Sequence, residues 1–489
     1  MLSGRKESKL YMTKMFSKDV AGNSNSMLYL QIAMMSCCIF NFDILWNLKE
    51  SLLITRLGAE VIPFIKLCVV MPVAFVFLIS YSFLANRLSK RTLFIVAIIP
   101  FLIWMPLFSI VIYPNLEAFA PTSALDLLSP LIPEHLQFIV GMLYYWPLTL
   151  FFALAELWGS AVICILFWTA VNDFHNTQSA TRQYPLITMI GSSASIISGP
   201  LLYYCVSREV TTPGSGWQES LKILSLLFVI FGLLILLLNE YCYRLTPEKI
   251  TESLSQNQTT TNLPLMASAR YLFRCPYLAS IALVMLAYCV AINMVELAWK
   301  SQLVEQYPSE ADYSMFMGKV ALINGIGSLL CGLLTPTLLN ISWWAAAFAT
   351  PVILTATALP FFLLAMFQKT QINFMGLCCI DLPMIGLQIG MYCHALGKSA
   401  KYTLFDATKE ITFVPLDAER KYKGKAAIEL VVSRVGKSGS SFFQQILIAL
   451  FGSLSLAMSW LAGAFILAIA LWLVAIKKLG RHYHARTDL

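Results

Sequence analysis

The sequence has little charge and lacks any region that resembles a soluble enzyme. Only 12% of its 489 residues are Asp, Glu, Lys or Arg, whereas 58% are hydrophobic. This composition excludes a soluble globular protein. No polar region is long enough to form a separate soluble domain, and no nucleophile–base pair stands out, so we expect no enzymatic activity.

Metal-binding and ATPase motifs are also missing. None of the 12 cysteines has CxxC spacing and the 5 histidines form no constellation, so we expect neither a metal site nor a cofactor. A GKS triplet occurs at 397–399 and again at 436–438, but both lack the upstream glycine of a phosphate-binding loop. The chain is therefore not predicted to be a P-loop ATPase.

Two further absences concern the ends and loops of the chain. Residues 1–26 lack the cleavage pattern of a secretory signal, so we expect a cytoplasmic tail. The long loop 114–137 contains acidic residues but no Lys or Arg, whereas loops on the opposite side hold most of the 34 basic residues. This bias predicts that both termini face the cytoplasm. The net charge of +8 is thus explained by the basic residues on the predicted cytoplasmic side, and we expect no nucleic-acid partner.

The sequence does contain a series of apolar runs that are long enough to cross a lipid bilayer. We predict an all-α polytopic membrane protein with twelve transmembrane helices, at about 27–47, 60–84, 92–113, 138–170, 184–206, 218–241, 276–300, 313–340, 343–368, 373–397, 424–452 and 454–476. A polar stretch after the sixth span indicates two six-helix halves, the plan of major-facilitator transporters.

The predicted domains follow from these spans. They are a cytoplasmic tail (1–26), an N-terminal bundle (27–241), a cytoplasmic linker (242–275), a C-terminal bundle (276–476) with a cytoplasmic connector (398–423), and a second cytoplasmic tail (477–489).

Several charged residues lie inside the predicted spans, where an unpaired charge is costly. Lys49 closes the first span, either as a functional cation or as a helix end that reaches the interface. Glu156 lies too deep in the fourth span to reach water, so we expect it to be paired, protonated or facing a cavity. Glu296 shares a helix face with Lys300, and a local ion pair between them is the alternative to a functional role.

The eleventh predicted span has a polar face. On a helix of about 100° per residue, the polar side chains of 425–445 fall within an arc of about 220°. This arc includes Lys425, Glu429, Arg434 and Lys437. Such a face must turn toward water, a ligand or protein. We interpret it as part of a transport pathway.

Four segments carry a resemblance to a known family. They are GAEVIPFIK (58–66), AELWGS (155–160), VELAWKSQL (295–303) and the long segment GKSAKYTLFDATKEITFVPLDAERKYKGKAAIE (397–429). Together they resemble the ATP/ADP translocase, or nucleotide transporter, family of plastids and obligate intracellular bacteria. The resemblance covers nearly the whole hydrophobic chain. It implies a major-facilitator-like fold, nucleotide substrates and the inner membrane of an intracellular bacterium.

The resemblance also implies roles for particular residues. Four membrane charges that matter for transport in the family correspond to Lys49, Glu156, Glu296 and Lys425. The predicted function is exchange of nucleoside tri- and diphosphates by alternating access. The cations Lys49 and Lys425, with Arg434 and Lys437, would contact the polyphosphate, and the two glutamates would hold these cations when no substrate is bound.

Three alternatives stay open. Proton-coupled nucleotide import requires a titrating carboxylate, for which the candidates are Asp43, Glu156, Glu296 and Glu429. NAD/ADP exchange is the second alternative, because the chain departs from the adenylate exchangers at several positions, including Asn47. A facilitator for another organic anion is the third.

Overall fold

The computed structural model of the chain describes residues 22–85, 87–122, 129–133, 136–172, 174, 177–210, 216–245, 275–366, 372–374, 378–413, 415–416, 428 and 432–487. Their contacts divide the chain into two compact units. Unit 1 comprises Met1–Val61, Ile65–Thr259 and Tyr307–Leu329, and unit 2 comprises Ile62–Phe64, Thr260–Gln306 and Leu330–Leu489. One long helix, α16 (Glu310–Ile341), contributes its first part to unit 1 and the rest to unit 2.

The helices of unit 1 follow the apolar runs of the sequence. They are α2 (Gly22–Leu57), α4 (Met71–Ala85), α5 (Lys90–Leu107), α7 (Phe138–Tyr144), α8 (Trp146–Trp158), α9 (Trp168–Asn172), α10 (Thr177–Ser192), α11 (Ser195–Val210) and α12 (Trp217–Leu245). Short π- and 3₁₀-helical segments join them, namely η1 (Lys66–Val70), η2 (Phe108–Ile112), η3 (Tyr113–Phe119), η4 (Ser129–Leu131) and η6 (Gly159–Phe167). The short helix α3 (Val61–Ile65) is divided between the two units.

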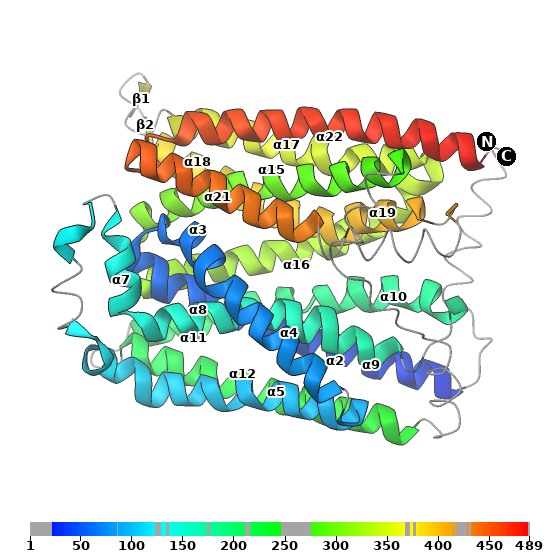
Figure 1. Cartoon of the computed structure of the whole chain (residues 1–489), viewed down its shortest axis with the longest axis horizontal. Coiled ribbons are helices and arrows are strands. Elements are labelled where there is room, and N and C mark those ends of the chain that lie inside the picture. Colours follow the sequence, from blue (N-terminus) through cyan, green and yellow to red (C-terminus); the bar gives the residue numbers. More distant parts are fainter. Residues whose placement is uncertain are drawn as a thin grey trace. The chain divides into compact units, whose positions relative to one another are not determined.

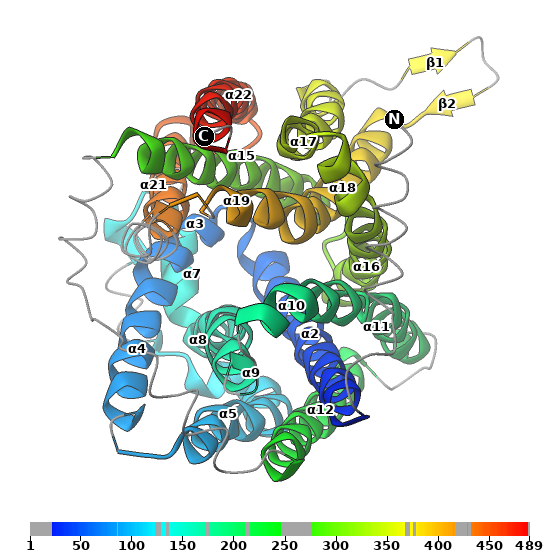
Figure 2. The ribbon, with the colours of Figure 1, turned by 90° about the vertical axis from the view of Figure 1, so that its right-hand side faces the viewer.

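The core of unit 1 forms where α2 packs against α12, α10 and α8 (Figure 2). Trp158 is fully buried there, with ring centroids 5.0 Å from Phe228 and 5.4 Å from Phe101. By contrast, Leu226 and Leu237 on another face of α12 are exposed. Exposed apolar surface of this kind is what lipid chains cover.

Unit 2 is also helical. It contains α15 (Pro276–Gln306), α17 (Trp343–Met366), α18 (Leu382–Ala400), η7 (Lys401–Phe405), α19 (Asp406–Thr412), α21 (Ser433–Phe451) and α22 (Met458–Thr487). In Figure 1, α22 runs alongside α17, and α15 packs against α22, α21 and α18. The strands β1 (Ile372–Phe374) and β2 (Cys378–Ile380) pair antiparallel, with Asn373 opposite Cys379.

The membrane assignment rests on helix length and composition. Within the described residues, 10 helices are long and apolar enough to cross a bilayer. The spans predicted at 373–397 and 424–452 correspond to α18 and α21, which have 19 residues each and are not among the 10. The all-α membrane fold predicted from the sequence is confirmed, and the number twelve stays a prediction.

The described part of the predicted connector 398–423 is mostly helical. Residues 398–412 continue α18 through η7 into α19 without a break. Lys409 of α19 is only 6% exposed, so this end of the helix belongs to the packed interior of unit 2.

Candidate functional site

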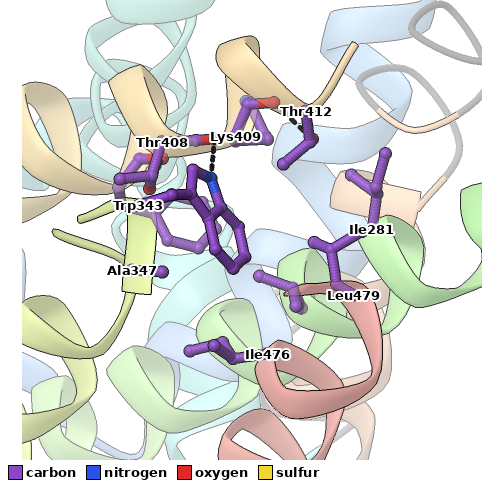
Figure 3. Close-up of a pocket in the computed structure, with 10 residues that line it drawn as sticks. Ile281, Trp343, Ala347, Thr408, Lys409, Thr412, Ile476 and Leu479 are labelled. Carbon is purple, nitrogen blue, oxygen red and sulfur yellow. Dashed lines mark hydrogen bonds between the residues drawn. The ribbon is translucent and has the colours of Figure 1, made fainter. Parts of the chain in front are cut away.

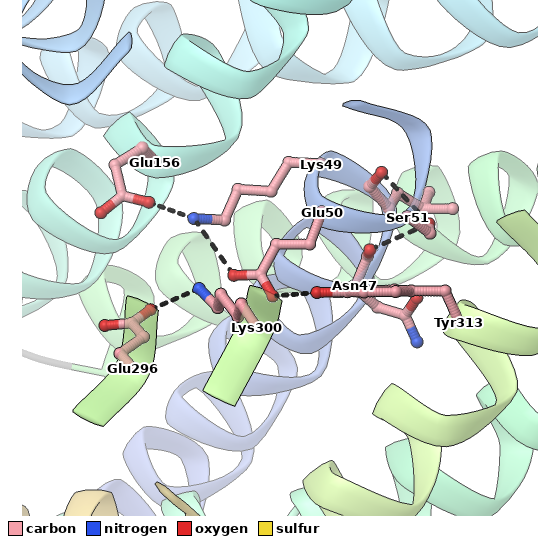
Figure 4. Close-up of polar contacts among 9 residues, drawn as sticks. Asn47, Lys49, Glu50, Ser51, Glu156, Glu296, Lys300 and Tyr313 are labelled. Carbon is pink, nitrogen blue, oxygen red and sulfur yellow. Dashed lines mark hydrogen bonds and ion pairs between the residues drawn. The ribbon is translucent and has the colours of Figure 1, made fainter. Parts of the chain in front are cut away.

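A buried charge cluster lies in unit 1 at Lys49 of α2. The residue is 4% exposed, and its ammonium group forms an ion pair with Glu156 of α8 (Figure 4). It also lies 3.9 Å from the carboxylate of the neighbouring Glu50, which is fully buried, and 4.5 Å above the ring of Phe152. The sequence therefore places a cation in a membrane-spanning helix and surrounds it with two carboxylates and an aromatic face. Lys49 is thus a buried cation and does not extend to an interface.

A second set of polar contacts ties α2 to the first part of α16. The amide of Asn47 donates to the carbonyl of Ser314 at 2.9 Å, and the Ser314 hydroxyl donates back to Asn47 Oδ1 at 2.7 Å. The hydroxyl of Tyr313 donates to Glu50 at 3.4 Å (Figure 4). Residues 47 and 50 are three apart, so one face of α2 makes both contacts.

Asp43 lies one turn before Asn47 and faces α11. It is 2% exposed, and its carboxylate accepts hydrogen bonds from the hydroxyls of Ser195, at 2.7 Å, and Ser198. The two hydroxyls satisfy part of the hydrogen-bonding capacity of this buried carboxylate. The role of Asp43 in proton coupling stays a prediction.

A third charged contact closes the C-terminal end of α2. The guanidinium of Arg56 donates to Glu310, the first residue of α16, at 2.6 Å, and Tyr113 of η3 donates to the same carboxylate at 2.5 Å. Arg56 also lies over the ring of Tyr145, 5.3 Å from its centroid. Three segments of unit 1 that are distant in sequence therefore meet at one carboxylate.

We expect Glu310→Gln to lower the free energy of unfolding by about 1 kcal/mol, because the pair is partly exposed and solvent weakens it. Thermal unfolding of the purified protein in detergent measures this change. Glu219→Gln is the matched control, since Glu219 pairs with Lys222 at 2.6 Å with both side chains exposed. Equal unfolding temperatures for the two variants would contradict a structural role for Glu310.

The charges of unit 2 include a pair within one helix. Lys300 donates to Glu296 at 2.5 Å across one turn of α15, and the Lys300 side chain is 1% exposed (Figure 4). The local pairing that the spacing allowed is therefore present. Glu296 is partly accessible from outside the core, because 15% of its side chain is exposed.

The polar face of α21 turns inward. Ser440, Ser441 and Gln444 are buried, and Gln444 donates to the carbonyl of Asn293 in α15 at 2.8 Å. On the other face of the helix, Phe442 is 56% exposed. These three residues of the predicted polar arc thus face protein, whereas Lys437 of the same arc is exposed and the apolar Phe442 faces outward.

Four residues of the predicted site belong to this part of the chain. Arg434 is half-buried and Lys437 is exposed, both in the first two turns of α21. Lys425 and Glu429 lie outside the described residues. Binding roles for all predicted site residues stay predictions.

Sequence reasoning missed the residues that hold these charges in place. Arg56, Glu310 and Tyr313 sit near helix ends, where polar residues are ordinary, so spacing gave no signal for them.

A small cavity of unit 2, about 20 Å³ in volume, is lined by residues such as Trp343, Lys409 and Ile476 (Figure 3). It holds about one water molecule at most and is too small for an organic ligand. Within the described chain, no group of His, Cys, Asp and Glu side chains has the arrangement of a metal site.

The helical architecture matches solved transporters. A D-xylose–proton symporter has a TM-score of 0.55 at 12% identity, over 91% of this chain and 97% of that chain. A nucleoside transporter structure has a TM-score of 0.51 at 13% identity, over 93% and 99%. At these identities the likeness shows the fold alone. The protein is thus a multi-pass membrane protein with a major-facilitator-like fold.

The sequence relatives narrow this class. The model of the TLC ATP/ADP transporter family matches residues 11–483, and the chain belongs to this family. It is 35% identical to ADP,ATP carrier protein 1 of Chlamydia pneumoniae, over 93% of this chain and 91% of the relative. It is 34% identical to the chloroplastic ADP,ATP carrier protein 1 of Arabidopsis thaliana, over 92% and 73%. The family predicted from the motifs is confirmed, and the chain is a carrier, not an enzyme.

Proposed function

We propose that this carrier exchanges ATP for ADP across a membrane by alternating access. Relatives that cover almost the whole chain are named ADP,ATP carriers, which supports the nucleotide class. The observation that carries the proposal is the buried Lys49, because a cation inside a membrane-spanning helix is costly unless a partner or a ligand offsets it. A nucleotide supplies several negative phosphate oxygens, which suit such a cation.

The pairing of Lys49 suggests how exchange is enforced. When no nucleotide is bound, Glu156 and Glu50 neutralise the ammonium group. An incoming phosphate competes with the carboxylates for the same cation, so binding of substrate replaces one set of contacts by another. In this proposal the carrier cannot switch between its two conformations while Lys49 stays paired with these carboxylates. It therefore switches back only when a counter-substrate is bound.

The remaining predicted residues have parallel roles in this proposal. Lys425, Arg434 and Lys437 contact phosphate, and Glu296 holds a cation, Lys300, in the absence of nucleotide. We place the carrier in the inner membrane of an intracellular bacterium with both termini in the cytoplasm. The relatives from Chlamydia and Rickettsia support that placement, as does the asymmetry of basic residues.

Reconstitution tests the proposal. The purified full chain is placed in liposomes that are either empty or loaded with ADP, and uptake of labelled ATP is followed with and without a pH gradient. We expect rapid uptake only into loaded liposomes, independent of the gradient. Gradient-driven uptake into empty liposomes would contradict exchange and favour proton-coupled import through Asp43, Glu156, Glu296 or Glu429.

The same assay separates the substrate alternatives. Unlabelled ATP, ADP, NAD and a sugar phosphate are added as competitors. NAD/ADP exchange is favoured by one observation: Asn47, a position where the chain is expected to depart from the adenylate exchangers, hydrogen-bonds to Ser314. We expect ATP and ADP to compete best, and stronger competition by NAD would overturn this preference.

A further inference from the structure

Two arginines share one carboxylate at one end of unit 1, where the start of α5 meets the end of α12. The two helices pack against each other (Figures 1 and 2). Arg91, in the first turn of α5, donates from Nε to Oε2 of Glu240 in α12 at 2.6 Å, and from Nη2 to Oε1 of the same carboxylate. Arg244, one turn after Glu240, donates from Nε to that Oε1 at 2.9 Å. Both guanidinium groups therefore contact the same oxygen atom. We call Arg91 and Arg244 the arginine pair.

One carboxylate cannot satisfy both guanidinium groups, since two positive charges meet one negative charge. Arg91 uses its Nε and one Nη, and Arg244 uses only its Nε. Most of their N–H groups therefore have no protein acceptor among the residues that the structure describes. The Arg91 and Arg244 side chains are 50% and 71% exposed. The arginine pair thus offers a surplus positive charge and unused donors to a ligand outside the protein.

Stability does not explain this arrangement. Ion pairs between exposed side chains contribute little to the free energy of unfolding. A cation in the first turn of α5 is also disfavoured by the positive end of the helix dipole. Ser89 already caps this helix, because its hydroxyl accepts from the backbone N–H of Thr92 at 3.2 Å. Topology predicts basic residues at a cytoplasmic end, but not that two of them meet at one carboxylate. A bound anion would neutralise the surplus charge and would be favoured by the dipole.

The position of Arg244 indicates which kind of anion binds. A row of apolar side chains, each between 49% and 64% exposed, runs along α12 at intervals of three or four residues, and so on one helix face. Its members, counted back from Arg244, are Tyr241, Leu237, Leu233, Ile230 and Leu226. From Leu226 to Arg244 the helix rises about 27 Å, close to the hydrocarbon thickness of a bilayer, about 30 Å. Arg244 therefore lies at the level where acyl chains end and lipid phosphates begin.

We propose that the arginine pair binds the phosphodiester group of an anionic phospholipid whose acyl chains lie on the apolar row of α12. Guanidinium groups suit phosphate oxygens, because their planar fork donates two parallel hydrogen bonds. Glu240 holds both arginines in position before the lipid arrives. A zwitterionic headgroup fits less well, since its ammonium group meets the surplus positive charge. Lipid binding at this site is a function beyond the proposed exchange of nucleotides and does not depend on it.

The test is a titration of the purified full chain in detergent with phosphatidylglycerol, followed by its unfolding temperature. Phosphatidylcholine and soluble glycerol phosphate are the comparison ligands. We expect phosphatidylglycerol alone to raise the unfolding temperature of wild type. Arg91→Gln and Arg244→Gln should each weaken the apparent affinity about fivefold, and the double variant about 25-fold, as expected for basic residues near anionic lipid. Arg87→Gln is the matched control, because Arg87 is exposed four residues before Arg91 and lies 4.0 Å from the ring centroid of Phe83. It should bind like wild type.

Four results would overturn the lipid site. The first two are a wild type that phosphatidylglycerol does not stabilise and a double variant with unchanged affinity. The third is an equal loss of affinity in Arg87→Gln, which would indicate a diffuse effect of surface charge. The fourth is equal stabilisation by glycerol phosphate, which would indicate a site for free phosphate.

Glu240→Gln decides the question even if the double variant does not fold, because it removes no cation. The substitution adds one net positive charge at the site, so phosphatidylglycerol should bind about fivefold more tightly. A purely structural role of the carboxylate predicts a lower unfolding temperature without lipid and no gain in affinity. Binding no tighter than that of wild type contradicts the proposal.

Discussion

Lys49→Gln is expected to lower nucleotide exchange by at least about 100-fold. The variant leaves Glu50, which is fully buried, and Glu156 without the ammonium group that lies between them. Removal of one partner from a buried ion pair costs about 3–5 kcal/mol, and the lower end applies here because 35% of the Glu156 side chain is exposed. If about 3 kcal/mol of this appears in the barrier for exchange, the rate falls about 100-fold. Counter-exchange in loaded liposomes measures the rate, and thermal unfolding in detergent measures the folding cost separately.

The control for this prediction is a lysine whose ion pair is exposed. Lys222 pairs with Glu219 within one turn of α12, with side chains 40% and 48% exposed. Lys222→Gln should change stability by less than about 0.5 kcal/mol and leave exchange intact. An exchange rate of Lys49→Gln equal to that of wild type would contradict the assignment of Lys49 to the transport pathway.

A double variant separates a substrate contact from a structural pair. Lys49→Gln combined with Glu156→Gln removes one unmatched carboxylate, so the unfolding temperature should recover toward wild type. Exchange should not recover, because the cation that meets phosphate is still missing. Recovery of both properties would mean that the pair is structural only.

Much of the fold could be predicted from sequence because the bilayer imposes strict rules. Spanning segments must be long, apolar and helical, so runs such as 218–241 were identified and reappear in α12. The same rule drew attention to Lys49 and Glu156, since a charge within such a run needs a reason. A pair four residues apart on one helix, such as Glu296 and Lys300, could also be anticipated.

Pairing between helices could not be predicted, because it depends on which helices pack together. Nothing in the spacing of Asp43 and Ser198 shows that they touch, since 155 residues separate them. The helical extent of 398–412 was hidden for a different reason. Lys401 and Lys409 resemble the basic residues of a cytoplasmic loop, but in the structure both pair with Asp406 inside unit 2.

Gly199→Ala is expected to disrupt the packing of α11 on α16 within unit 1. A Cβ at Gly199 would lie 2.5 Å from both the carbonyl oxygen of Gly318 and the backbone nitrogen of Leu322. Both atoms are backbone, so no side-chain rotation relieves the clash and one helix must move. Overpacking of this kind costs about 1–3 kcal/mol.

The effect of Gly199→Ala on exchange should exceed its effect on stability. Separation of α11 from α16 also disturbs the contacts of Asn47 with Ser314, which join α2 to α16 four residues before Gly318. Gly463→Ala in α22 is the matched control, because no atom lies within 4 Å of its added Cβ and alanine favours a helix. Equal unfolding temperatures and exchange rates for the two alanine variants would show that the contact between α11 and α16 is looser than described. Slower exchange together with a lower unfolding temperature, in Gly199→Ala but not in Gly463→Ala, would tie exchange to the backbone contact itself, since the substitution adds one methyl group and removes no charge.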